Sequence, residues 1–126
     1  MVDGMATNTP VGDLETLERR YRDLAGQLAR IGIISAGSLT RRFTHCNRPG
    51  CRCGDDPPEL HGPYFQWTAK VNGKTVTRRL SAEEARRYAE WIANDRKLRR
   101  IIAEMRKLAS QAGELILAAD REAQAS

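Results

Sequence analysis

The sequence has 126 residues, a net charge of +5, and 40% hydrophobic but only 6% aromatic residues. These values suit one small domain with a modest core, which a bound metal ion would help to stabilise. No stretch approaches the roughly 20 apolar residues that a membrane span needs, and residues 1–12 have neither the charged segment nor the apolar run of a signal peptide. We therefore expect a cytoplasmic protein with no membrane partner.

The first periodic pattern begins after residues 1–12, which we expect to be disordered. From Asp13 to Ile31 the apolar residues recur at alternating spacings of three and four, which predicts an amphipathic helix over residues 13–31 with a heptad-like seam. Asp13 can cap the start of this helix, and Gly32 suits its end.

A β-hairpin is predicted around Asn72-Gly73, the dipeptide preferred where both central turn residues need a positive φ. The flanking strands are Tyr64–Val71 and Lys74–Leu80. Leu39–Phe43 can form a third strand, which could pair with either strand of the hairpin.

The turn also sets the hairpin register, because it places Val71 opposite Lys74. One face then carries the apolar residues Phe65, Trp67, Ala69, Val71, Val76 and Leu80. The other face carries Tyr64, Gln66, Thr68, Lys70, Thr75, Thr77 and Arg79. This second face is polar and basic, as an ordinary solvated face would also be.

Ser81-Ala-Glu-Glu84 is a capping box, in which the serine hydroxyl and the glutamate side chain satisfy each other's backbone amides. It predicts a second amphipathic helix over residues 82–112. Residues 113–126 follow a glycine and are expected to form a fraying tail.

All three cysteines of the chain lie between the two predicted helices, close to a histidine. Thiolate sulfur and imidazole nitrogen are the ligands that Zn²⁺ prefers in closed tetrahedral sites. We therefore predict a structural zinc site formed by Cys46, Cys51, Cys53 and His61. Turns at Pro49-Gly50 and at His61-Gly62-Pro63 can direct the ligands inward. Because Cys51 and Cys53 are only two apart, residue 52 must bulge outward.

The pattern leaves the fourth ligand open, because His45, Asp55 or Asp56 could replace His61. Three free thiols are the next interpretation, because free cysteine packs like a small apolar residue. A disulfide would leave one cysteine over and does not persist in a reducing cytosol. An iron–sulfur cluster usually has a fourth cysteine.

The excess of Lys and Arg falls between residues 36 and 81, around the predicted zinc site. A cationic surface attracts polyanions such as nucleic acid. The residues predicted to bind nucleic acid are Arg41, Arg42, Arg48, Arg52, Tyr64, Lys70, Lys74 and Arg79.

These elements predict an α+β fold. A small zinc-stapled antiparallel sheet, with its module at residues 38–80, would be flanked by the two amphipathic helices in a single domain over residues 13–112.

Several motifs resemble a family of small, uncharacterised bacterial proteins that are often encoded near transposase-like genes. The resemblance covers roughly residues 36–108 and rests on Gly37-Ser38-Leu39, Arg42, Cys46, Pro49-Gly50-Cys51-Arg52-Cys53, His61-Gly62-Pro63-Tyr64 and Gly73-Lys74. Asn47 departs from the pattern, where glycine is expected. The family has no established activity, but its gene neighbourhood implies a role with DNA.

The leading hypothesis is a zinc-stabilised, basic nucleic-acid-binding accessory protein whose contacts are mainly to phosphates. DNA rather than RNA is the expected partner, and the family resemblance implies a link to mobile-element transactions. The alternative is a zinc-ribbon interaction adaptor that pairs through its heptad-like helices, as a homodimer or with a larger protein. An enzyme is not expected, because no catalytic set of residues accompanies the cysteines.

Overall fold

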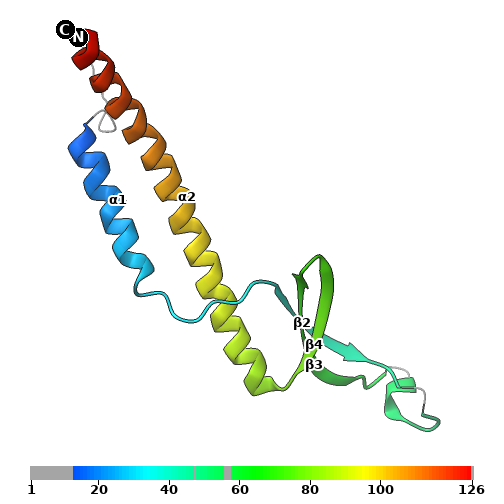
Figure 1. Cartoon of the computed structure of the whole chain (residues 1–126). Helices are drawn as coiled ribbons and strands as arrows, with labels where there is room; N and C mark the ends of the chain where they lie inside the picture. Colours follow the sequence, from blue (N-terminus) through cyan, green and yellow to red (C-terminus); the bar gives the residue numbers. More distant parts are fainter. Residues whose placement is uncertain (1–12, 47, 56–57, 126) are drawn as a thin grey trace. The chain divides into compact units, whose positions relative to one another are not determined.

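The computed structural model describes residues 13–46, 48–55 and 58–125. Residues 1–12, predicted to be disordered, lie outside these ranges. The elements are α1 (Leu14–Leu28), β2 (Ser38–Thr44), a short 3-10 helix η3 (Arg52–Gly54), β3 (His61–Val71), β4 (Lys74–Leu80) and α2 (Ala82–Ala125). Two helices and a three-stranded antiparallel sheet confirm the predicted α+β fold (Figure 1).

The chain divides into two compact units. The sheet unit consists of residues 32–95, and the helical unit consists of residues 1–31 together with 96–126. Because α2 is long, its first turns belong to the sheet unit and its remaining turns to the helical unit.

The sheet has the order β2-β3-β4. Its hairpin register is the predicted one, with Val71 opposite Lys74 and Phe65 opposite Leu80. Asn72 and Gly73 both have positive φ, 53° and 80°, as the turn requires. The third strand is longer than predicted, and it pairs with β3 rather than β4.

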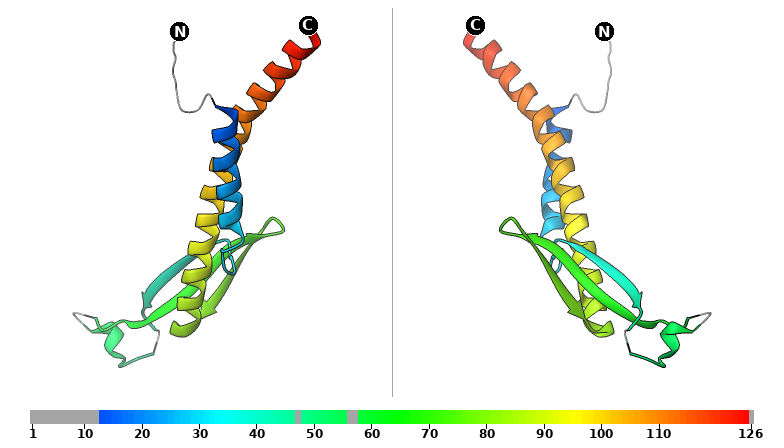
Figure 2. Two further views of the ribbon diagram at one scale, coloured as in Figure 1. Left: turned by 90° about the vertical axis from the view of Figure 1, so that its left-hand side faces the viewer. Right: turned by 90° about the vertical axis from the view of Figure 1, so that its right-hand side faces the viewer.

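The first turns of α2 cover the apolar face of the sheet. Tyr88 of α2 lies with its ring centroid 5.3 Å from Trp67 and 5.0 Å from Trp91, and its hydroxyl accepts a hydrogen bond from Arg78 at 3.3 Å. Figure 2 shows these turns running across the sheet. Buried side chains here are Ala69, Leu80, Ala85 and Ile92. The opposite, polar face is not used in this packing.

The predicted capping box at the start of α2 is confirmed. The Ser81 amide donates to Glu84 Oε1 at 2.8 Å, and the Glu84 amide donates to Ser81 Oγ at 3.1 Å. The backbone amide of Ser81, followed by its hydroxyl, lowers the pKa of the Glu84 carboxyl because both hydrogen bonds favour the carboxylate.

The far end of α2 differs from the prediction. The helix continues to Ala125, through the segment 113–126 that was expected to fray. A single interior glycine costs a helix only about 1 kcal/mol, and Gly113 lies beside α1 residues Glu18 and Tyr21 in one apolar hollow. No helix among the described residues is long and apolar enough to cross a membrane.

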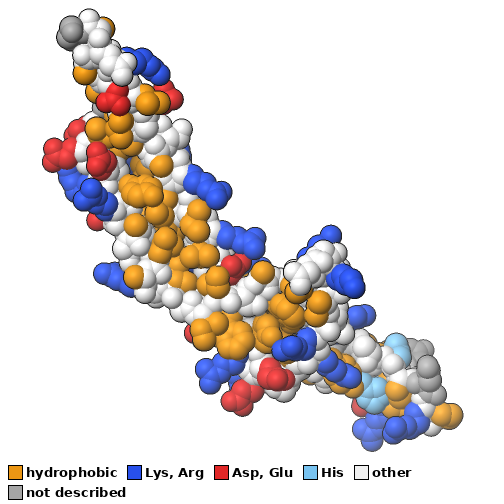
Figure 3. Space-filling view, viewed as in Figure 1, with side chains coloured by type: hydrophobic (Ala, Val, Ile, Leu, Met, Phe, Trp, Pro, Cys, Tyr) orange, Lys and Arg blue, Asp and Glu red, His pale blue; other side chains and the backbone are white. Residues whose placement is uncertain are grey.

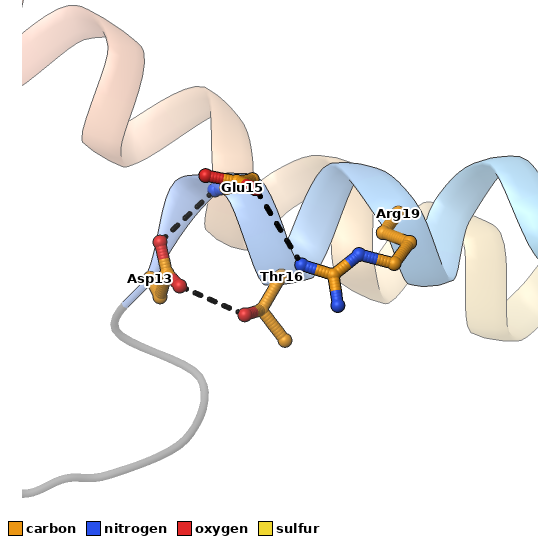
Figure 4. A network of polar contacts seen from close by, with 4 residues as sticks. All are labelled: Asp13, Glu15, Thr16 and Arg19. Atoms are coloured by element: carbon orange, nitrogen blue, oxygen red, sulfur yellow. Dashed lines mark hydrogen bonds and ion pairs between the residues drawn. The ribbon is translucent and has the colours of Figure 1, made fainter.

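In the helical unit, α1 begins as predicted with Asp13 as its N-cap. The carboxylate accepts hydrogen bonds from the Glu15 amide at 3.1 Å and from the Thr16 hydroxyl at 2.8 Å. Glu15 in turn forms an ion pair with Arg19 at 3.7 Å, and Figure 4 shows this network.

The end of α1 comes at Leu28, earlier than the predicted Ile31. The amides of Arg30 and Ile31 bond three residues back, to the carbonyls of Gln27 and Leu28. This tightened last turn satisfies carbonyls that the helix leaves unpaired, so Gly32 is not needed as a cap.

Leu17 of α1 is completely buried, together with Ile101 and Leu108 of α2. An ion pair between Arg20 and Glu104 links the two helices at 4.0 Å. Hydrophobic side chains form a band along both helices on the face seen in Figure 3. The predicted amphipathic seams therefore pack against each other within the chain.

Candidate metal centre

Three thiols and one imidazole converge in the connection between β2 and β3. The ligand atoms of Cys46, Cys51, Cys53 and His61 all lie within 4.8 Å of one another. Cys46 follows β2, Cys51 precedes η3, Cys53 lies within η3, and His61 is the first residue of β3. The four residues that the sequence singled out thus form one cluster.

A tight turn and η3 bring the two later cysteines together. The Cys51 amide donates to the Arg48 carbonyl at 3.3 Å across Pro49-Gly50, and the Gly54 amide donates to the Cys51 carbonyl at 3.0 Å. Cys53, within η3, is buried, with 1% exposure. The intervening Arg52 bulges outward as expected: its side chain is 78% exposed and pairs with Glu59 at 3.5 Å.

The separations within the cluster suit a tetrahedral metal ion. Cys46 Sγ lies 3.4 Å from Cys53 Sγ, and Cys51 Sγ lies 3.0 Å from His61 Nε2. Metal bonds of about 2.3 Å to sulfur and about 2.0 Å to nitrogen would place neighbouring ligand atoms about 3.5–3.8 Å apart in a tetrahedron. Small adjustments would bring these ligands to that geometry. All three cysteines are free thiols.

The cluster perturbs two of its thiols in opposite directions. The pKa of Cys46 is lowered, first by a hydrogen bond from the Arg48 backbone, then by the thiols of Cys51 and Cys53, with a smaller effect of the Arg48 charge. At Cys53 a backbone hydrogen bond from Cys46 acts to lower the pKa, but burial and the two neighbouring thiols together raise it. A metal cation would favour the thiolate at every position.

His61, rather than the other residues considered, completes the cluster. His45 instead places Nδ1 2.7 Å from the Cys53 carbonyl oxygen, a contact that supports the loop without providing a ligand. Asp55 is exposed and lies outside the cluster. Asp56, the remaining alternative, falls outside the described residues.

His61-Gly62-Pro63 was expected to form a turn, but these residues begin β3. His61 pairs with Thr44 next to an irregularity in the β2–β3 register. Gly62 has a φ of 132°, and a Cβ at this position would lie 2.7 Å from the Arg42 carbonyl oxygen. Only glycine allows this close approach between strands, so Gly62 fixes where the His61 ring is presented.

The residues predicted to contact nucleic acid are distributed over three places. By strand register, Arg42, Tyr64, Lys70 and Arg79 belong to the polar face of the sheet. Arg41 and Lys74 belong to the opposite face, because they are paired with Phe65 and Val71. Arg48 and Arg52 lie in the loop that carries the cysteines, and both are exposed.

On the polar face, the Arg79 guanidinium carbon lies 3.9 Å from the centroid of the Tyr64 ring. Gln66 and Thr44 line the same hollow but were not among the predicted binding residues. Gln66 was recognisable from its place on the polar face, whereas Thr44 lies beyond the predicted end of its strand. Lys and Arg side chains gather at the end of the sheet that carries the two histidines (Figure 3).

The fold and the site define a small α+β protein with a three-cysteine, one-histidine centre able to hold a metal ion. The family described as "Domain of unknown function (DUF6788)" matches residues 14–90, and the chain belongs to this family. This range includes α1, the sheet and all four candidate ligands. No curated protein and no solved structure matches the chain. This match confirms the expected membership of an uncharacterised family.

Proposed function

We propose that this chain is a zinc-stabilised, basic nucleic-acid-binding accessory protein whose contacts are mainly to phosphates. The observation that carries the proposal is the convergence of Cys46, Cys51, Cys53 and His61 at the end of strands whose polar face displays arginines. A metal at this position would fix the loop and the ends of β2 and β3 together, so that the basic side chains share one rigid support.

The donor set favours zinc among the common metals. Soft thiolates and an imidazole suit Zn²⁺, whereas Mg²⁺ and Ca²⁺ take oxygen ligands. Four protein ligands close the coordination sphere and leave no position for a substrate. The proposal therefore assigns the metal a structural role and assigns the chain no catalytic activity.

Phosphate binding is supported by the exposure and charge of the side chains around this centre. Arg48 and Arg52 are exposed in the loop between β2 and β3 that carries the cysteines, called the metal loop below. Guanidinium groups bind phosphate oxygens with two parallel hydrogen bonds. DNA is the preferred partner in this proposal, in line with the mobile-element context that the sequence resemblance implies.

The test is the salt dependence of binding, measured by fluorescence anisotropy with a labelled oligonucleotide. Five cations lie on the polar face or the metal loop: Arg42, Arg48, Arg52, Lys70 and Arg79. With about 0.7–0.9 counterions released per phosphate contact, affinity should fall at least about 100-fold between about 50 and 200 mM salt. Chelation of the metal should also weaken binding. Affinity that is unchanged over this salt range would refute the proposal.

A second candidate function, an interaction adaptor, is favoured by an apolar hollow on the helical unit. The hollow has a volume of about 250 Å³ and is lined by Tyr21, Leu108, Ala112 and Ile116 among others. Ile116 is 43% exposed. A second copy of the chain would present the same apolar hollow, as a symmetric dimer interface requires. A dimer in solution that is lost in Ile116→Glu would support this role, and a monomer at micromolar concentration would contradict it.

A further inference from the structure

A polar hollow opens on the face of the sheet that α2 does not cover. Its volume is about 270 Å³, and its lining consists of Arg42, Thr44, Tyr64, Gln66 and Arg79. Ligand sites for small molecules are commonly about 300–1,000 Å³, so this hollow has room for one small unit and not for a duplex. All three strands contribute to it.

Two diagonal contacts across the central strand arrange these side chains. Arg42 is paired with Tyr64 in the ladder, but its Nη1 donates to Gln66 Oε1 at 3.4 Å. Arg79 is paired with Gln66, but its guanidinium lies over the Tyr64 ring at 3.9 Å. Arg42 therefore contacts Gln66, and Arg79 contacts Tyr64. The two positive charges lie on either side of the Tyr64 ring and the Gln66 amide.

The side chains in the hollow offer three different interactions to a ligand: a hydrogen bond, a stacking surface and a positive charge. A guanidinium only donates hydrogen bonds, so the contact with Arg42 directs the Gln66 oxygen toward the arginine and leaves the amide nitrogen to donate to a ligand. The Arg79–Tyr64 stack offers a planar surface, and nucleobases stack on both aromatic rings and guanidinium planes. The remaining donors of Arg42 suit a phosphate oxygen.

An unpaired nucleotide combines these requirements. Its base has a π-face and hydrogen-bond acceptors at its edge, and its phosphate carries the negative charge. A base within a duplex has both faces stacked and could not stack on the Arg79–Tyr64 pair without leaving its neighbours. Tyr64 and Gln66 are each half-buried in the strand between the two arginines, which favours insertion of a single splayed base.

We propose that this hollow binds one unpaired nucleotide of a single-stranded nucleic acid, with its base on the Arg79–Tyr64 stack and its phosphate at Arg42. The inference rests on the proposed nucleic-acid-binding function and narrows its partner to single strands. Gln66 then acts as the hydrogen-bond donor to the base edge, a residue outside the set predicted from the sequence.

The experiment compares metal-loaded wild-type protein with Tyr64→Leu and Tyr64→Phe, using fluorescence anisotropy. The probes are a labelled single-stranded DNA of thymidines, the same strand annealed to its complement, and a single-stranded RNA of uridines of the same length. Loss of stacking by one base should weaken single-strand binding about 5- to 150-fold in Tyr64→Leu. Tyr64→Phe should retain most of the affinity, because it keeps the ring. Thermal unfolding of both variants checks that the sheet remains folded.

The salt slope provides a second readout. Tyr64→Leu should leave the slope unchanged, whereas Arg42→Gln should reduce it by about 0.7, the value for one phosphate contact on a single strand. Preferential binding of either single strand over the duplex supports the inference, and the tighter of the thymine and uracil strands identifies DNA or RNA as the partner.

Two results would overturn the inference while leaving the proposed function intact: equal affinity for the duplex and the single strand, or single-strand affinity in Tyr64→Leu equal to that of wild type. Salt-dependent binding would still be observed in both cases. Failure of every probe to bind at low salt is a different result, because it removes the proposed function itself.

Discussion

Substitution of Gly62 by alanine should weaken the metal centre without removing any ligand. Gly62 has a φ of 132°, which L side chains rarely adopt, and the new Cβ would lie 2.7 Å from the Arg42 carbonyl oxygen and 3.1 Å from the Tyr64 amide. These neighbours are backbone atoms of β2 and β3, so neither can rotate away. The two strands must separate, or Gly62 must change its conformation, and either movement displaces His61.

The expected magnitude follows from the cost of such strained backbone, about 1–3 kcal/mol. If this cost falls on the metal-bound state, zinc affinity drops about 5- to 150-fold, since about 1.4 kcal/mol corresponds to a factor of ten. Competition with a chromophoric chelator measures this change directly.

Gly54→Ala is the matched control, because it lies in the same loop beside Cys53 and its Cβ would meet no atom within 4 Å. It should bind zinc within about twofold of wild type, equivalent to about 0.4 kcal/mol. Equal zinc affinity in Gly62→Ala and Gly54→Ala would show that the close approach at Gly62 does not position His61.

Three further predictions concern stability. Ser81→Ala should lower the free energy of unfolding by about 1 kcal/mol, because the N-cap of α2 is lost; urea denaturation measures this, and no change would contradict the capping role. Glu84→Gln should be less stable than wild type at pH 7, and the difference should vanish as the pH falls through the lowered pKa of Glu84, because stability from a depressed carboxyl pKa exists only above that range; a difference that persists in acid would refute the assignment. Leu17→Ala should cost about 2–5 kcal/mol, because Leu17 is fully buried, whereas Leu117→Ala, at a side chain that is 49% exposed, should cost about 0.5 kcal/mol or less; similar thermal midpoints for the two variants would contradict the packing of α1.

The elements with strong local signals were predictable from the sequence. Asn72-Gly73 sets a two-residue turn, so the whole hairpin register follows from it. The capping box at Ser81 and the cap at Asp13 are likewise local hydrogen-bond patterns, and both are present. The metal ligands were recognisable because thiol and imidazole groups are rare in the chain and lie together in the sequence.

Features that depend on contacts between distant residues were not predictable in the same way. The pairing of β2 with β3 places Arg42, and not its neighbour Arg41, on the polar face, and this could not be known while either hairpin strand was a possible partner. The end of α2 was predicted at residue 112 because Gly113 weakens a helix locally, yet the structure continues it to Ala125. The strand conformation of His61-Gly62-Pro63 depends on the approach of β2, which no local pattern encodes.

The metal content of the purified protein tests the central claim most directly. The protein would be prepared without added metal and analysed by elemental mass spectrometry, alongside His61→Ala and His45→Ala. The account predicts about one zinc per chain, from the closed ligand set, in wild type and in His45→Ala, and a loss or marked reduction in His61→Ala. Absence of metal from the wild type, or its loss in His45→Ala but not in His61→Ala, would contradict it.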